Sequence, residues 1–394
     1  MKKRVNLLFF SILFSISIIA QESKGYQFET IYDLDATAVC DQHRSGTCWS
    51  FSGQSFLESE MIRIGKKPVI LSQMFVVRHC YSDKAVKYVR MHGETNFGSG
   101  GAFHDVLYVL KNYGAVPETI YDGLQYGENK HVHGEIDAIL KNYVDAVVTN
   151  PNKKLTPSWH QGFNSVLDAY FGELPENFTI EGKSYTPKSY AKEVVALNPE
   201  DYVQIGSFTH HPFYTNFIIE IPDNWMWGKI FNVPLDELIT IMTESIKNGF
   251  TIGWATDVSE KGFSHKNGIA IVPETELTEM QDSEREKWET LSKEEREKRL
   301  YSFDEPLKEM IITQEIRQEA FDNHLTTDDH GMHITGLAKD QYGTIYFKVK
   351  NSWNTDNVFD GYLYASETYV KYKTISIMVH KNAIPKNIRT KLGL

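Results

Sequence analysis

The sequence predicts an α+β protein that pairs a helical lobe with a sheet-based lobe and carries inserted segments. Helical periodicity dominates residues 21–145. Short apolar or alternating runs, broken by Gly and Asp, dominate residues 248–275 and 325–382. Residues 146–247 show a mixed pattern and residues 276–324 a charged helical one, and both are interpreted as insertions. Two lobes of this kind enclose a cleft, which is a natural place for an active site.

The first 20 residues have the features of an export signal. Lys2, Lys3 and Arg4 form a charged start, the apolar run VNLLFFSILFSISIIA follows, and Ala20 offers a small residue for cleavage. The run is shorter than the roughly 20 residues that a membrane span needs, and serines interrupt it. We therefore expect an exported protein, periplasmic or secreted, without stable membrane anchoring.

Composition argues against two classes of protein. The 394-residue chain has a net charge of −11, and removal of the basic leader would make it more negative. Such a surface repels phosphate backbones, so we expect no nucleic-acid partner. An aromatic fraction of 13% argues against a disordered chain.

Residues 48–64 predict the first helix of the N-terminal lobe. Thr47 is a candidate N-cap, and Gly65 and Pro68 are expected to end the helix. Cys48 would lie in the first turn, where unpaired N–H groups and the positive end of the helix dipole favour a thiolate. The apolar face that the spacing predicts consists of Trp49, Gly53, Phe56, Leu57, Met61 and Ile64.

The remaining elements follow from similar patterns. Residues 71–81 predict a short helix, and residues 98–117 predict a glycine-rich entry followed by a helix. The charged segment 276–324 predicts solvated helix without chemistry, and residues 383–394 form a tail. The strands of the second lobe are expected in FTIGWATDV, HITGLAKD, TIYFKVKNSW, GYLYASETYV and TISIMVH.

The three cysteines leave the disulfide pattern open. In an oxidising compartment an odd number leaves one thiol free or pairs it between chains. A bridge between Cys40 and Cys80, with Cys48 free, could stabilise the fold by about 4 kcal/mol. Three reduced cysteines are the alternative.

The segment DQHRSGTCWSF is compatible with a thiol nucleophile. Such a cysteine needs a base, a group that orients the base, and donors for the oxyanion. His330 or His333 could supply the base, Asn351 the orienting oxygen, and the Gln42 amide and the Cys48 N–H the donors. A structural cysteine with ordinary histidines would give the same residue types, so this pattern alone is only suggestive.

A metal site is the competing interpretation of the histidine segment. Asp328, Asp329, His330 and His333 all carry ligand atoms, but no HExxH motif or pair of zinc-binding cysteines accompanies them. We therefore expect no metal and no cofactor.

Several segments together resemble papain-like cysteine peptidases: QHRSGTCWSF, GSGGAFHDVLYVLKNYGAVPETIYDG, DDHGMHITG and KNSWN…DGYLYAS. FIIEIPDNW and ITQEIRQEAFDNHLTTDDH resemble insertions of the bleomycin hydrolase/aminopeptidase C branch. The resemblance runs from about Tyr26 to Pro385. It implies a papain-like two-lobe fold, with a helical lobe, an antiparallel β-barrel-like lobe and inserted subdomains.

The resemblance also implies roles for individual residues. Cys48 matches the nucleophile, His330 the base, Asn351 the orienting residue and Gln42 the oxyanion residue. The family histidine opens a segment that reads HGM here, which selects His330 over His333.

Neighbouring positions complete the comparison with the family. Gly100 and Gly101 match the glycine pair whose backbone pairs with an extended substrate, where we expect a Cβ to hold the peptide away. Ser45 stands where secreted members carry a disulfide cysteine, and Asn354 replaces the usual glycine after NSW.

The resemblance implies an exported cysteine peptidase, most simply an aminopeptidase that acts on short peptides. In this branch a C-terminal arm enters the cleft, and the tail at 383–394 looks shorter, so an endopeptidase is an alternative. A catalytically silent peptide-binding or assembly protein is the alternative from another class. A homo-oligomer is also possible, because members of the branch form hexamers.

Overall fold

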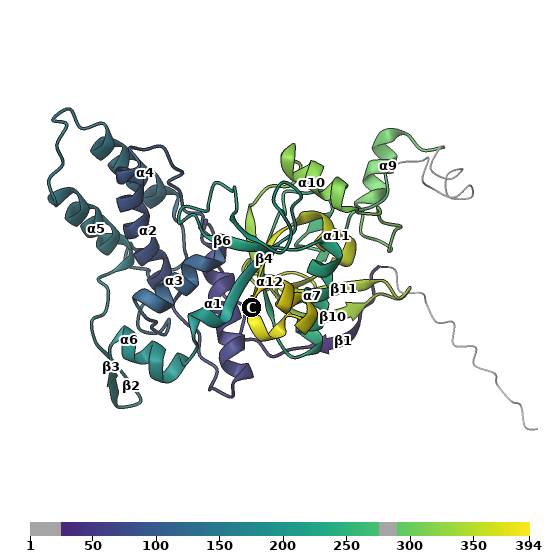
Figure 1. The fold of residues 1–394 in the computed structure, drawn as a ribbon, viewed down its shortest axis with the longest axis horizontal. Coiled ribbons are helices and arrows are strands. Elements are labelled where there is room, and N and C mark those ends of the chain that lie inside the picture. Colours follow the sequence, from purple (N-terminus) through teal and green to yellow (C-terminus); the bar gives the residue numbers. More distant parts are fainter. Residues whose placement is uncertain (1–24, 276–289) are drawn as a thin grey trace, which may run out of the picture.

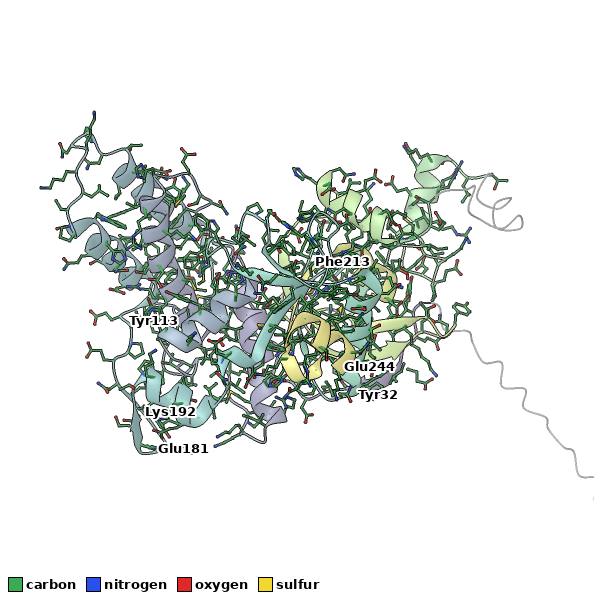
Figure 2. The ribbon with its side chains drawn as sticks, viewed as in Figure 1. Tyr32, Tyr113, Glu181, Lys192, Phe213 and Glu244 are labelled. Carbon is green, nitrogen blue, oxygen red and sulfur yellow. The ribbon has the colours of Figure 1, made fainter. Side chains whose placement is uncertain are left out.

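The computed structural model describes residues 25–275 and 290–394, so the predicted leader at 1–20 lies outside the described residues. A helical lobe and a sheet lobe lie side by side (Figure 1), which confirms the predicted fold class. The stick view places Tyr113, Glu181 and Lys192 on the helical side and Glu244 on the sheet side (Figure 2). Within the described ranges, no helix has both the length and the apolar character that a membrane span requires.

Helix α1 (Cys48–Arg63) lies between the two lobes and is buried along almost its whole length. It packs against helices on one side and the sheet on the other, so its polar residues are buried as well as its apolar face. Thr47 occupies the N-cap position, as predicted, but its side chain makes no cap hydrogen bond and lies 2.6 Å from the Ser45 hydroxyl. The helix ends before Gly65, as predicted, because the Gly65 φ of 78° is incompatible with a right-handed helix.

Four further helices form the body of the helical lobe: α2 (Gln73–Arg90), α3 (Phe103–Asn112), α4 (Gly134–Val148) and α5 (Ser158–Phe171). Helix α2 is longer than the predicted 71–81, because residues 82–90 contain neither Gly nor Pro. Small elements close the lobe: β2 (Phe178–Ile180), β3 (Lys183–Tyr185), α6 (Pro187–Tyr190), η1 (Ala191–Val195) and η2 (Pro199–Asp201).

Eleven of the described strands form one sheet, in the order β5-β6-β4-β13-β7-β10-β11-β12-β9-β8, with β1 added to β10. All pairs are antiparallel except β4–β6 and β9–β12. The strands are β1 (Glu29–Asp33), β4 (Tyr202–Gly206), β5 (Asn216–Ile218), β6 (Lys229–Asn232), β7 (Ile252–Thr256), β8 (Phe263–Ser264), β9 (Ile269–Ala270), β10 (His330–Lys339), β11 (Ile345–Lys350), β12 (Tyr362–Ser366) and β13 (Thr374–His380).

Further helices accompany the sheet. They are α7 (Leu235–Lys247), α9 (Lys293–Leu300), α10 (Gln314–Asp322), α11 (Glu367–Lys373), η4 (Lys381–Ala383) and α12 (Lys386–Leu392). Ile388 and Leu392 of α12 join the apolar core of the sheet lobe, together with Leu238 of α7. The C-terminal tail is therefore packed against the sheet lobe.

The structure divides the predicted insertion 146–247 between the two lobes. Helices α4 and α5 pack on α2 in the helical lobe. Strands β4, β5 and β6 join the main sheet through β13, and α7 packs on β7 and β10. Of the charged segment 276–324, residues 276–289 lie outside the described residues.

Helix α10 departs from the solvated helix that we expected in the charged segment. Its Arg317 is buried and donates hydrogen bonds to the carbonyl oxygens of Ser207, Lys371 and Thr374. The guanidinium thus ties α10 to two parts of the sheet lobe that are distant in sequence.

Strand β10 approaches α1 very closely at Gly331. A Cβ at this position would lie 2.9 Å from the Ser52 hydroxyl and 3.4 Å from the Trp49 Cα. Glycine is therefore required for the two lobes to close at the start of α1, next to Cys48 and His330.

Gly331→Ala should lower the free energy of unfolding by about 1–3 kcal/mol, because the added methyl group overpacks the contact between β10 and α1. Urea unfolding would measure the change. Gly134→Ala is the matched control, since nothing lies within 4 Å of a Cβ at that position. Equal unfolding midpoints for the two variants would contradict the steric role of Gly331.

Candidate active site

A cavity of about 290 Å³ opens beside the N-terminal end of α1. Both lobes contribute to its wall: the helical lobe through the loop at 99–102 and the sheet lobe through the residues that begin β10. Six of the lining residues matter most for its chemistry: Gln42, Cys48, Gly100, Asp223, Asp328 and His330.

Cys48 is the first residue of α1, and its side chain is partly exposed to this cavity. Burial, followed by the charges of Asp328 and Asp223, raises the pKa of the Cys48 thiol to about 12. The backbone N–H groups of Gly331 and Trp49 act in the opposite direction. The sequence pattern favoured a thiolate, but burial and the carboxylates outweigh the helix start, so the thiol is the favoured form in the free protein.

His330 is held in a defined orientation by Asn351. The His330 Nε2 lies 2.8 Å from the Asn351 Oδ1, and the Ser352 backbone N–H donates to the same oxygen. Because this oxygen accepts both bonds, Nε2 carries the hydrogen, and the Nδ1 of the neutral ring carries the lone pair. Burial lowers the pKa of His330 to about 4, although the bond to Asn351 opposes this effect.

Two aromatic neighbours complete the surroundings of this hydrogen bond. The Trp353 ring centroid lies 4.5 Å from that of His330, where it covers the imidazole. The Asn351 Nδ2 lies 3.3 Å from the His265 Nδ1, so the amide is held from both ends. Sequence reasoning missed His265, because the surrounding FSHKNG contains turn residues and no motif.

Gln42 is fixed by three hydrogen bonds. Its Oε1 accepts from the Ser352 hydroxyl at 2.6 Å, its Nε2 donates to the Ser45 carbonyl at 2.8 Å, and its backbone N–H donates to the Ser352 carbonyl. An amide nitrogen carries two hydrogens, so one hydrogen remains for a ligand in the cavity. The first N–H groups of a helix lack intrahelical partners, which leaves the Cys48 N–H as a second donor.

Gly100 and Gly101 lie in the cavity wall, but the reason for glycine differs from our expectation. A Cβ at Gly100 would lie 1.9 Å from the Asp223 Oδ2. A Cβ at Gly101 would collide with the Asp105 carboxylate at 2.6 Å and with the Trp49 ring at 2.8 Å. Protein atoms, and not only a bound peptide, exclude side chains here.

His333 does not line the cavity. Its ring is fully buried between the lobes, where Nδ1 lies 2.9 Å from the Ser55 hydroxyl. Two other residues of the competing metal interpretation have protein partners of their own. Asp329 accepts hydrogen bonds from Val258 and Ser259, and His330 bonds to Asn351.

One group elsewhere has metal-ligand spacing. Among the described residues, the ligand atoms of His210, His211 and Glu220 all lie within 4.8 Å of one another. The Gln318 amide hydrogens approach the His210 Nδ1, so the His210 Nε2 carries a hydrogen and donates it to Glu220. Hydrogen bonds therefore account for this group.

The three cysteines are unpaired, which corrects the suggested bridge between Cys40 and Cys80 and agrees with the alternative. The Cys80 Sγ lies 4.0 Å from the Asp105 carbonyl, inside the helical lobe. The Cys40 Sγ lies 3.9 Å from the Ala38 carbonyl.

The two departures from the family motif have local explanations. The Ser45 hydroxyl donates to the Gln42 carbonyl at 2.8 Å and so ties the loop before α1 together without a disulfide. Asn354 has a φ of 74°, a left-handed conformation that suits glycine and that Asn tolerates better than most residues.

Sequence reasoning missed the cavity carboxyl of Asp223 and considered Asp328 only as a metal ligand. Asp223 lies between β5 and β6, and Asp328 lies two residues before His330. Burial, together with the charges of Asp223 and Asp329, raises the pKa of Asp328 to about 8. A turn sequence such as IPDN predicts where the chain bends but not what it faces.

Asp328→Asn should raise Tm by about 2 °C or more at pH 8.5 and change it little at pH 4.5. The unfolded carboxyl ionises near pH 4, whereas the folded one holds its proton up to about pH 8, so this group lowers stability as pH rises between these values. Thermal unfolding at both pH values would measure the difference. A gain of the same size at pH 4.5 would contradict the raised pKa.

The comparisons with known proteins agree with this fold. The family model of the Peptidase C1-like family matches residues 295–393. The chain is 22% identical to an aminopeptidase C of Listeria monocytogenes, over 91% of this chain and 83% of the relative. It is 19% identical to a mitochondrial cysteine proteinase 1 of Saccharomyces cerevisiae, over 94% and 80% of the two chains.

A solved structure extends the comparison to the fold. The crystal structure of PepW from Lactobacillus rhamnosis superposes with a TM-score of 0.69 at 16% identity, covering 93% of this chain and 84% of that one. The chain is therefore similar in sequence to aminopeptidase C and to the Peptidase C1-like family, and it has the fold of PepW.

Proposed function

We propose that the chain is an exported cysteine aminopeptidase that hydrolyses short peptides with Cys48, His330, Asn351 and Gln42. The observation that carries this proposal is the hydrogen bond between the His330 Nε2 and the Asn351 Oδ1. It leaves the lone pair of the imidazole on Nδ1, and His330 lines the same cavity as Cys48.

In the first half of the reaction, the Cys48 thiol gives its proton to the Nδ1 of His330. The thiolate attacks the peptide carbonyl carbon, and a carbon–sulfur bond forms. The imidazolium then protonates the leaving amine as the carbon–nitrogen bond breaks. Asn351 stabilises the imidazolium because its Oδ1 already accepts the Nε2–H bond.

In the second half, the neutral Nδ1 takes a proton from water, and the hydroxyl adds to the thioester carbon. The carbon–sulfur bond breaks, the imidazolium of His330 returns its proton to the thiolate, and the carboxylic acid product leaves. In both halves, the free Gln42 amide hydrogen and the Cys48 N–H can stabilise the oxyanion.

Two observations support an aminopeptidase that acts on short peptides. Curated relatives of similar length are named aminopeptidase C, and one from Lactobacillus delbrueckii is named aminopeptidase G. The cavity volume of about 290 Å³ lies at the small end of ligand pockets.

Among the described residues, none of the cavity lining comes from the tail at 383–394, so the tail does not limit the cleft here.

Export is proposed from the N-terminal leader alone. The charged start, the apolar run and Ala20 form the pattern of a cleavable signal. The substrates would then be peptides outside the inner membrane.

Cys48→Ser and His330→Ala should each lower kcat by about a thousandfold or more, because each removes a group that takes part in bond making or proton transfer. Asn351→Ala should cost less, since Asn351 orients the base. Release of the first residue from unblocked dipeptide amides, followed by mass spectrometry, would measure the rates. Ser50→Ala in α1 is a control with a buried hydroxyl outside the cavity lining.

The same assay separates the alternatives when it includes N-acetylated peptides. Faster cleavage of unblocked peptides supports the aminopeptidase, and equal cleavage of long blocked peptides indicates an endopeptidase. Absence of turnover in the wild-type protein would indicate a silent binding protein. A severe loss in His333→Ala with normal activity in His330→Ala would overturn the assignment of the base.

The mature protein should begin after Ala20 when the full gene is expressed in a bacterial host. N-terminal sequencing of protein from the periplasm or the medium would test this expectation. Replacement of Phe10 and Leu13 by Asp should keep the uncleaved chain in the cytoplasm, because it interrupts the apolar run. Recovery of wild-type protein only in the cytoplasm, with its leader intact, would contradict export.

A further inference from the structure

Asp223 reaches from the sheet lobe to the glycine pair of the helical lobe. Its Oδ1 accepts a hydrogen bond of 3.0 Å from the Asn96 Nδ2, and its Oδ2 lies against Gly100. An extended peptide that pairs with Gly100 and Gly101 would therefore meet a carboxylate at this point. A chain that continued further would have to pass the segment that carries Asp223.

Asp328 faces the same cavity without a partner. No hydrogen bond or ion pair joins its carboxyl to another of the described residues. The adjacent Asp329 behaves differently, because its carboxylate accepts bonds from the Val258 and Ser259 N–H groups and from the Ser259 hydroxyl. The Asp328 carboxyl is half-buried in the cavity wall, and it is therefore available to a ligand in the cavity.

The cavity contains no cation that could balance these groups. Of the described lining residues, three are Asp and none is Lys or Arg. Lys84 is the nearest source of positive charge to Asp223, but its ammonium group donates to the Gly98 and Gly100 carbonyl oxygens. The acidic pair therefore lacks a counter-charge within the cavity itself.

We propose that Asp223 and Asp328 form an anionic subsite that binds a positively charged nitrogen of the substrate, either its α-ammonium group or a Lys or Arg side chain. This inference rests on the proposed peptidase function. The substrate class is then peptides that place a cation beside Asp223 and Asp328 in the cavity. A cation between two carboxyls gains charge-assisted hydrogen bonds from both.

The subsite would also couple binding to the nucleophile. Asp328 and Asp223 both raise the pKa of the Cys48 thiol, and burial, together with the charges of Asp223 and Asp329, raises the pKa of Asp328 to about 8. A bound cation offsets this repulsion, so that both carboxyls and the thiolate can be ionised together. Occupation of the subsite then favours the reactive form of Cys48.

Three aminomethylcoumarin amides, with cleavage at each bond followed by mass spectrometry, test the proposal: Ala-Ala, N-acetyl-Ala-Ala and N-acetyl-Lys-Ala. Asp223→Asn and Asp328→Asn should each lower kcat/KM for the peptide whose cation is bound by about tenfold or more. The uncharged N-acetyl-Ala-Ala amide should change by less than about threefold. A loss of kcat/KM confined to Ala-Ala identifies the α-ammonium group as the bound cation. A loss confined to N-acetyl-Lys-Ala identifies the Lys side chain.

Glu176→Gln is the matched control, because it removes an exposed carboxylate outside the cavity. If Asp223→Asn and Asp328→Asn both keep the wild-type preference for a cationic peptide, the subsite is overturned. The peptidase function would remain intact. Absence of wild-type turnover on all three amides would instead overturn the proposed function.

Alkylation of Cys48 by iodoacetamide gives a readout that needs no turnover. At pH 8.5, the rate should rise by about threefold or more in Asp223→Asn and in Asp328→Asn, because each variant removes a charge that opposes the thiolate. The Glu176→Gln rate should match the wild type. Equal rates in all four proteins would show that the carboxyls do not act on the thiol and would overturn the coupling.

Discussion

The close contact of β10 with α1 at Gly331 is the constraint on which the site depends. Cys48 belongs to the helix and His330 to the strand, so neither lobe alone contains both groups. The absence of a side chain at Gly331 lets the strand lie on the helix backbone beside Trp49. The chemistry of the cavity is therefore a consequence of how the lobes pack.

A buried network of polar side chains fixes how the two lobes pack on each other. The Ser55 hydroxyl bridges the His333 ring and the Lys350 ammonium group, and Lys350 also donates to Thr37, which donates to Glu58. Such networks add little net stability, but they penalise any shifted arrangement in which a member loses its partner. His333 thus has a structural environment, although its sequence position resembles that of His330.

The sequence predicted the parts of the fold whose signals are local. Helix α1 and the strands β7, β10, β11 and β13 follow from periodicity. The grouping of Cys48, Gln42 and His330 around one cavity was implied by the resemblance to papain-like peptidases. Contacts between distant segments left no such pattern. The pairing of β4 with β13, the burial of Arg317 and the reach of Asp223 to Gly100 depend on tertiary packing that no local window contains.

The central claim is that the sulfur of Cys48 forms the covalent intermediate. The most direct measurement is acid quenching of the protein during turnover of an unblocked dipeptide ester, followed by peptide mapping by mass spectrometry. The account predicts an acyl adduct on the peptide that contains Cys48, and no adduct in Cys48→Ser. Turnover without any adduct on Cys48, or an adduct on Cys40 instead, would contradict it.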